Sequence, residues 1–145
     1  MDVKLINPFI SATLYVLETM ASTKAEAGKP FLKENQVAIG DITSVIRLTG
    51  DASGTISVSF AEKSFLAIVA NMFGEEMKGL NDEIGDAVGE IANMISGQAR
   101  KKLGETGKSL KAAIPTVIMG KNHTICHETS GVYSQGTAAS KGPLF

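Results

Sequence analysis

One stretch of the chain, residues 81–104, constrains the fold most strongly because it predicts a long amphipathic helix. Asn81 can cap its start, acidic residues occupy its first turn, and Gly104 follows its expected end near residue 103. Apolar side chains recur at helical spacing along it and form one stripe, made of Ile84, Val88, Ile91 and Ile95. Such a stripe has to be buried against another element, so this helix requires a packed core.

The segments before this helix predict a shorter helix followed by a β-hairpin. Asn7 as the cap and Pro8 as the first helical residue predict a helix over residues 7–20. Residues 23–36 are polar, and we expect a short strand and a connection there. Apolar alternation then predicts a hairpin over residues 39–60 that turns within residues 49–54.

Another helix precedes the long one, and more strands follow it. Ser59 and Glu62 have the spacing of a capping box for a helix that ends near residue 72, before Gly74. Residues 113–119 and 122–126 predict a second strand pair, whereas residues 128–145 show no clear apolar alternation and are left unassigned. A helix-then-strands unit occurs twice. This order predicts a single α+β domain over residues 1–145, with one antiparallel or mixed sheet and helices that cover one of its faces.

The charge balance excludes two broad classes of partner. Fourteen basic and fifteen acidic residues give a net charge of −1, which provides no broad basic surface for nucleic acid or an anionic membrane. The densest basic run, residues 100–102, falls late in the long helix, where cations complement the helix dipole. No segment approaches the roughly 18 uninterrupted apolar residues of a membrane helix. Cys126 is the only cysteine, so an internal disulfide is impossible, and we expect a soluble cytoplasmic protein.

A second face of the long helix carries polar and small side chains. Asp86, Glu90, Asn93 and Gly97 follow one another at intervals of four, three and four residues, so they line up along the helix. Asparagine is a poor helix former at such a position. Small residues surround the acid and the amide: Gly85, Ala87, Gly89, Ala92, Ser96 and Gly97. Two interpretations stay open, a solvated outer face or a surface shaped for the close approach of another protein.

His123, Cys126 and His127 are the other concentration of reactive side chains. On a strand, the two histidines would lie on one face and Cys126 on the other. The three side chains would then not converge on one metal ion, and Cys126 would point away from its neighbouring base. We therefore expect surface or interface histidines and no metal site.

The polar face belongs to a longer pattern that resembles the CheC/CheX/FliY phosphatases. The motif Asp86-x-x-x-Glu90-x-x-Asn93 is followed by Pro115 in the segment IPTVIMG, residues 114–120. The segment INPF at residues 6–9 and the strand pair at residues 46–50 and 54–58 extend the resemblance to residues 5 to about 127.

The number of motifs indicates the branch of this family. CheC-like members carry the acid–amide motif on two helices. Here Glu18 of the first predicted helix is followed three residues later by Ala21, so the motif occurs once. A single active helix is similar to CheX.

The resemblance implies a CheC-like fold and a phosphatase that hydrolyses the aspartyl phosphate of a CheY-type response regulator. It implies that Glu90 and Asn93 are the catalytic pair: Asn93 positions the attacking water, and Glu90 pairs with a lysine of the receiver's active site. Asp86, Gly89 and Gly97 would contact the partner. The resemblance also implies a homodimer without a cofactor of its own, because the Mg²⁺ ion is expected in the receiver.

Two other functions stay open. FliY-like relatives suggest a non-catalytic module that binds a receiver or takes part in a flagellar switch. A phosphatase of the same fold could also act on a receiver outside chemotaxis. The presence of both Glu90 and Asn93 favours catalysis, and the turnover of an acyl phosphate separates an enzyme from a binding module.

Overall fold

The computed structural model describes residues 3–27, 31–32, 40–74, 79, 81–120, 132–133, 136–138 and 142–143. Helices and strands alternate along these residues in the α+β order that the sequence predicts. The elements are α1 (Val3–Ala21), β1 (Ala25–Ala27), β2 (Phe31–Leu32), β3 (Ile42–Gly50), β4 (Gly54–Phe60), α2 (Glu62–Phe73), α3 (Asp82–Glu105), β5 (Leu110–Ala112), β6 (Thr116–Met119), β7 (Val132–Tyr133), β8 (Gly136–Ala138) and β9 (Gly142–Pro143).

Strand β3 is the centre of the main sheet, which is antiparallel throughout. β4 pairs along one edge of β3, from Ile42 opposite Phe60 to Leu48 opposite Gly54, as the predicted hairpin requires. β6 and β5 share the other edge, one after the other. The strand predicted over residues 113–119 is thus shorter and begins at residue 116. Pro115 lies in the break between β5 and β6, since proline cannot donate to a strand ladder.

Two smaller antiparallel sheets were not predicted. β1, β8 and β9 form one of them, and β2 and β7 form the other. β7, β8 and β9 fall within residues 128–145, which the sequence analysis left unassigned. Each has only two or three residues, too few to show apolar alternation. Residues 122–126, expected to form a strand, lie outside the described residues.

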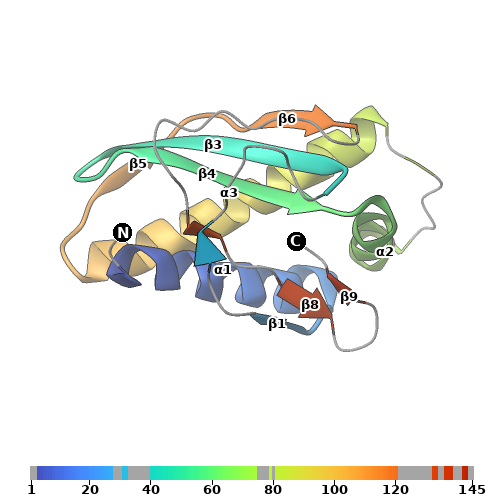
Figure 1. Ribbon diagram of the computed structural model, residues 1–145, viewed down its shortest axis with the longest axis horizontal. Coiled ribbons are helices and arrows are strands. Elements are labelled where there is room, and N and C mark those ends of the chain that lie inside the picture. Colours follow the sequence, from blue (N-terminus) through green and yellow to red (C-terminus); the bar gives the residue numbers. More distant parts are fainter. Residues whose placement is uncertain are drawn as a thin grey trace.

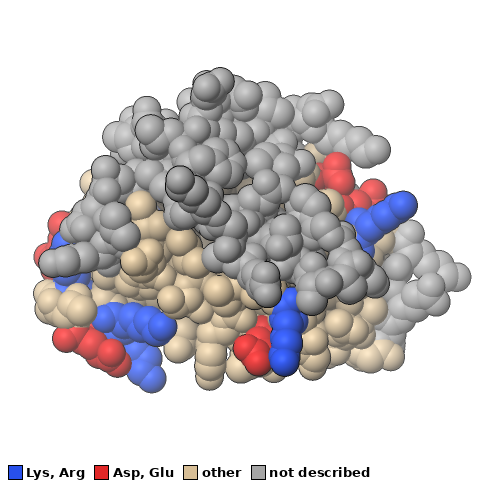
Figure 2. Space-filling view, turned by 60° about the horizontal axis from the view of Figure 1, so that its bottom comes forward, with Lys and Arg blue, Asp and Glu red and all other residues tan. Residues whose placement is uncertain are grey.

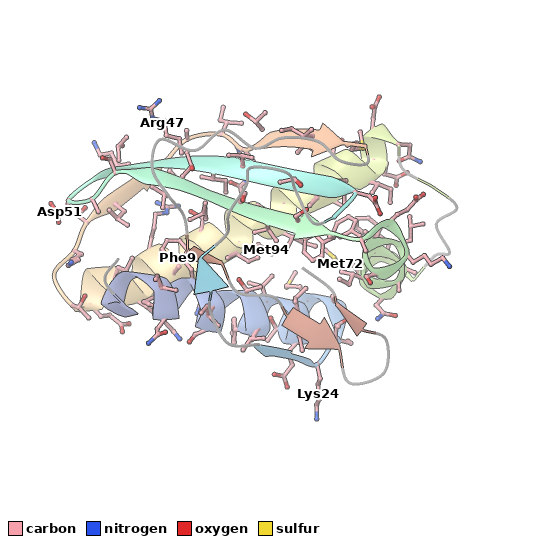
Figure 3. The ribbon with its side chains drawn as sticks, viewed as in Figure 1. Phe9, Lys24, Arg47, Asp51, Met72 and Met94 are labelled. Carbon is pink, nitrogen blue, oxygen red and sulfur yellow. The ribbon has the colours of Figure 1, made fainter. Side chains whose placement is uncertain are left out.

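The helices lie on one face of the main sheet. α3 packs directly on the sheet, α1 packs on α3, and the small sheet formed by β1, β8 and β9 lies beyond α1 (Figure 1). Phe9, Met72 and Met94 are partly buried and pack against the core (Figure 3). Among the described residues, no helix is long and apolar enough to cross a membrane. The larger cluster of buried side chains is contributed by all three helices and the sheet: Ala12, Val16, Leu17, Ala21, Ile42, Val58, Phe60, Phe65, Ile68, Val69, Ile84, Ala87, Val88, Ile91, Ile95 and Ala99.

The first helix starts earlier than the sequence predicts. α1 begins at Val3, so Asn7 is not its cap and Pro8 lies inside it. A proline inside a helix removes one backbone donor, whose acceptor would be the carbonyl of the residue four positions earlier. That carbonyl belongs to residue 4, in the first turn. The cost is therefore confined to one hydrogen bond near the end of the helix.

The predicted capping box of α2 is wrong, because an acceptor from another part of the chain replaces it. Ala61 occupies the cap position without a side-chain hydrogen bond, and the Glu62 backbone N–H donates to Oδ2 of Asp41 at 2.9 Å. Ser59 Oγ instead accepts from the Gly40 N–H at 3.1 Å and from Thr43 Oγ1 at 2.8 Å. The carboxylate just before β3 thus caps the helix that follows β4.

The start of α3 and the end of α2 agree with the prediction. Asn81 Oδ1 accepts from the Ile84 backbone N–H at 3.0 Å, as an N-cap side chain does. Gly74 follows α2 in the left-handed conformation, with φ at 70°. α3, however, continues through Gly104 to Glu105, two residues beyond its expected end.

The cap from Asp41 generates a stability prediction. Asp41→Ala removes the acceptor of the Glu62 N–H, and we expect the free energy of unfolding in urea to fall by about 1 kcal/mol. Asp41→Asn is the matched control, because its amide oxygen still accepts, and it should retain most of the stability. Equal stability of Asp41→Ala and the wild-type protein would contradict this account of the cap.

Candidate functional site

Helix α3 is covered on two sides, which leaves a narrow exposed face. It packs on β3, β5 and β6 on one side and on α1 on the other. Asp86, Glu90 and Asn93 are exposed, and Gly97 is half-buried in line with them. We call these four residues the α3 stripe. Its alignment is as the sequence predicts. The residues of α3 that the packing buries are Ile84, Gly85, Ala87, Val88, Ile91, Ala92, Ile95, Ser96, Ala99 and Leu103.

Most small residues around the stripe serve packing inside the molecule. Four of the six, Gly85, Ala87, Ala92 and Ser96, are buried. A Cβ atom on Gly85 would lie 3.6 Å from Cε of Met119, and one on Gly89 would lie 3.6 Å from Cγ2 of Val117. A Cβ atom on Gly97 would have no neighbour within 4 Å. The idea that small residues clear space for a partner therefore fits Gly97, whereas the Cβ position of the half-buried Gly89 faces Val117.

The carboxylates and the amide of the α3 stripe are available for contacts with another molecule. In the part of the chain that the structure describes, the side chains of Asp86, Glu90 and Asn93 make no hydrogen bond or ion pair. Glu90 and Asn93 are three residues apart on a helix, so their side chains are neighbours on its surface. The stripe therefore presents a carboxylate and an amide side by side, on a helix that is held on both flanks.

The described residues offer no metal centre next to this pair. No group of three or more His, Cys, Asp or Glu side chains in residues 3–27, 40–74 and 81–120 is arranged to hold a metal ion. His123, Cys126 and His127, which we expected not to bind metal, lie outside the described residues.

A groove of about 410 Å³ adjoins the stripe at the C-terminal end of α3. Gly97 lines it together with the loop after the helix. The sequence does not predict this groove, because no periodic pattern relates Lys108 of the loop to Arg100 of the helix. The residues that line it are Gly97, Arg100, Lys101, Gly104, Gly107, Lys108, Ser109 and Leu110.

The other visible charges do not gather into a field of one sign. Figure 2 views the molecule from the side of α1, where the coloured acidic and basic side chains lie next to each other near both ends. This distribution agrees with the net charge of −1.

Residues 42–135 of the chain match the family model described as chemotaxis phosphatase CheX. The CheY-P phosphatase CheX of Thermotoga maritima is 28% identical over 123 residues, which cover 84% of this chain and 79% of that relative. The crystal structure of chemotaxis protein CheX from Vibrio vulnificus has a TM-score of 0.89 and 38% identity, covering 98% of this chain and 95% of that one.

The same fold also occurs in a complex with a receiver. The structure of a CheX–CheY–BeF3–Mg²⁺ complex from Borrelia burgdorferi has a TM-score of 0.82 and 24% identity. It covers 97% of this chain and 93% of that one. This likeness shows a shared fold.

The open space beside Gly97 generates a prediction about stability. Gly97→Ala should raise the free energy of unfolding by about 0.5–1 kcal/mol, because alanine is the better helix former and its methyl group meets no neighbour. Gly85→Ala is the buried counterpart, with its methyl group in ordinary contact with Met119 and Val117, and should stabilise the protein similarly. Urea unfolding measures both, and a destabilised Gly97→Ala variant would contradict the description of this surface.

Proposed function

The chain belongs to the CheX family of chemotaxis phosphatases, and on this basis we propose that it hydrolyses the aspartyl phosphate of a CheY-type response regulator. The observation that carries the proposal is the exposed acid and amide side by side on α3. The pair stands on the outer face of a helix, so a substrate must supply the other wall of the site. A folded protein that carries the phosphoryl group can do this, whereas a small metabolite cannot.

The burial of α3 suits the demands of phosphoryl transfer. An acyl phosphate is already activated, so its hydrolysis depends mainly on placing a water molecule in line and tolerating the charge of the transferring group. Placement requires a side chain whose backbone does not move. α3 meets this requirement, because the main sheet and α1 hold it on both flanks.

Asn93 is the proposed water-positioning residue. Its side-chain carbonyl can accept a hydrogen bond from the attacking water, and its amino group can donate to an oxygen of the phosphoryl group. The amide carries no charge, so the phosphate does not repel it. Its exposure in the middle of the helix allows it to enter a partner's active site.

Glu90 has a different proposed role, because a carboxylate next to a phosphate dianion would be repelled. We assign it to a cation of the partner, a lysine of the receiver's active site. This ion pair would dock α3 and draw the lysine into position. Asp86, Gly89 and Gly97 flank the pair and form the rest of the proposed contact surface.

The metal ion of the reaction is placed in the partner. The described part of the chain has no cluster of ligands for Mg²⁺, whereas the complex of the same fold from Borrelia burgdorferi contains CheY, BeF3 and Mg²⁺. We propose that the receiver brings the ion, which neutralises charge on the phosphoryl oxygens. The residues of this chain would then supply only the positioned water and the docking contacts.

The role of Asn93 predicts a loss of turnover without a loss of binding. Asn93→Ala should lower the catalysed rate of dephosphorylation by about 100-fold, because the water is no longer held in line. The decay of a phosphorylated CheY-type receiver with Mg²⁺ measures this rate. Gln98→Ala, which removes an amide from another face of α3, is the control and should keep the wild-type rate.

Two results would go against this function. If the wild-type protein leaves the decay unchanged but binds the receiver, the chain is a binding module. If Asn93→Ala hydrolyses as fast as the wild-type protein, the chemistry lies elsewhere.

The role of Glu90 predicts a combined effect. Glu90→Gln keeps the shape of the side chain but removes its charge, so we expect KM to rise about 10-fold, the equivalent of roughly 1.4 kcal/mol, and kcat to fall as well. The same decay assay, run over a range of receiver concentrations, separates the two constants. Glu18→Gln makes the same charge change on the exposed surface of α1 and should alter neither. An unchanged KM for Glu90→Gln would remove this residue from the docking contact.

A further inference from the structure

The groove at the end of α3 concentrates positive charge. Arg100, Lys101 and Lys108 all line it, and none of the described residues that line it is acidic. Arg100 Nε donates to Ser96 Oγ at 3.3 Å, and among the described residues none of the three cations makes an ion pair. The nearby carboxylate of Asp51 is hydrogen-bonded to a residue that lines the groove: its Oδ2 accepts from the Ser109 backbone N–H at 2.7 Å. We call this feature the basic groove.

The helix dipole explains only part of this charge. Cations in the last turns of a helix are stabilised by its C-terminal carbonyls, which accounts for the basic run of residues 100–102. Lys108 comes after the helix has ended. The loop delivers it, with the Lys108 N–H bonded to the Leu103 carbonyl at 3.0 Å. The loop after α3 therefore adds a third cation that the stability of the helix does not require.

The turn of the β3–β4 hairpin holds that loop in place. Besides accepting from the Ser109 N–H, Asp51 donates its own backbone N–H to the Ser109 carbonyl at 3.0 Å. Asp51 and the turn after α3 both lie at the left end of the molecule in Figures 1 and 3. These two bonds join segments that are 58 residues apart and fix one wall of the basic groove.

The hydrogen bonds of the loop indicate which anions suit the basic groove. Backbone N–H groups that cradle a phosphate ion must be free to donate. Here the Gly107 N–H donates to the Gly104 carbonyl at 3.0 Å, and those of Lys108 and Ser109 are also occupied. Recognition is left to long, flexible cationic side chains. Such side chains can reach out to pair with the carboxylates of a protein surface.

The basic groove lies within reach of any protein that docks on the α3 stripe. Gly97 belongs to both, and Lys101 is eight residues beyond Asn93, or about 12 Å along the helix axis. A stable interface buries about 800 Å² on each partner, a patch that extends well beyond this distance. The exposed face of α3 is thus acidic toward its start, at Asp86 and Glu90, and basic at its end.

We propose that the basic groove receives an acidic segment of the receiver's surface and so sets the orientation of the receiver on the α3 stripe. This inference rests on the proposed function. Because the two ends of this face carry opposite charges, a partner with complementary charges can dock on it in only one orientation. A reversed partner would bring like charges together, which costs binding free energy. The basic groove would then place the phosphoryl group at Asn93 without touching it.

The experiment is a charge reversal in the basic groove. The double variant Lys101→Glu/Lys108→Glu should raise KM for the phosphorylated receiver at least 10-fold, leave kcat within twofold, and reduce the dependence of KM on salt. Lys102→Glu is the matched control, because Lys102 is exposed on the same helix but does not line the groove, and it should keep KM within twofold. Equal values of KM for the double variant and the control would overturn the proposal, and so would a fall in kcat alone.

Two further measurements separate this inference from its alternatives. Calorimetry can measure the binding of a receiver loaded with BeF3 and Mg²⁺. This measurement tests the basic groove even if the protein does not catalyse hydrolysis. A weaker binding of the double variant supports the groove, and unchanged binding overturns it. Inorganic phosphate is the competing ligand. Inhibition by millimolar phosphate that disappears in the double variant would assign the groove to a phosphate ion and overturn the proposal.

Discussion

The burial of α3 between the main sheet and α1 is the interaction on which the rest of the molecule depends. Its apolar side chains join those of α1, α2 and the sheet in one core. Residues that would lower the stability of an isolated helix, such as Gly85, are tolerated because the packing of the buried apolar side chains stabilises α3. The same burial leaves one face of the helix exposed, so packing decides both the stability of α3 and the surface that it can offer.

Glu90 and Asn93 lie exposed on that face, which determines the kind of chemistry they can perform. An exposed pair of side chains on one helix cannot by itself exclude water or surround a small ligand. It can, however, enter the active site of another protein and complete it. In the proposed reaction, the receiver contributes the phosphoryl group and the metal ion. This chain contributes a water-positioning amide at Asn93, a carboxylate at Glu90 and, through the basic groove, the orientation of docking.

Two aspartates outside α3 show how the fold supports this surface from a distance. Asp41 caps α2 from the start of β3, and Asp51 connects the hairpin turn to the loop after α3. Each carboxylate accepts a backbone N–H that would otherwise need water or a local side chain. Through Asp51, the hairpin holds the loop that brings Lys108 beside Arg100. A change in the hairpin turn can therefore alter a groove built mainly by other elements.

The sequence by itself determined the features that depend on neighbours a few residues apart. The cap of α3 at Asn81, the β3–β4 hairpin and the alignment of Asp86, Glu90 and Asn93 follow from local spacing, and all three are present. Only the tertiary structure decided the cap of α2, the short strands near the C-terminus and the basic groove. Those features depend on residues that are far apart in the sequence, such as Asp41 with Glu62, Asp51 with Ser109 and Ala25 with Ala138. No periodicity in the sequence relates such distant residues, because only the packing of the core brings them together.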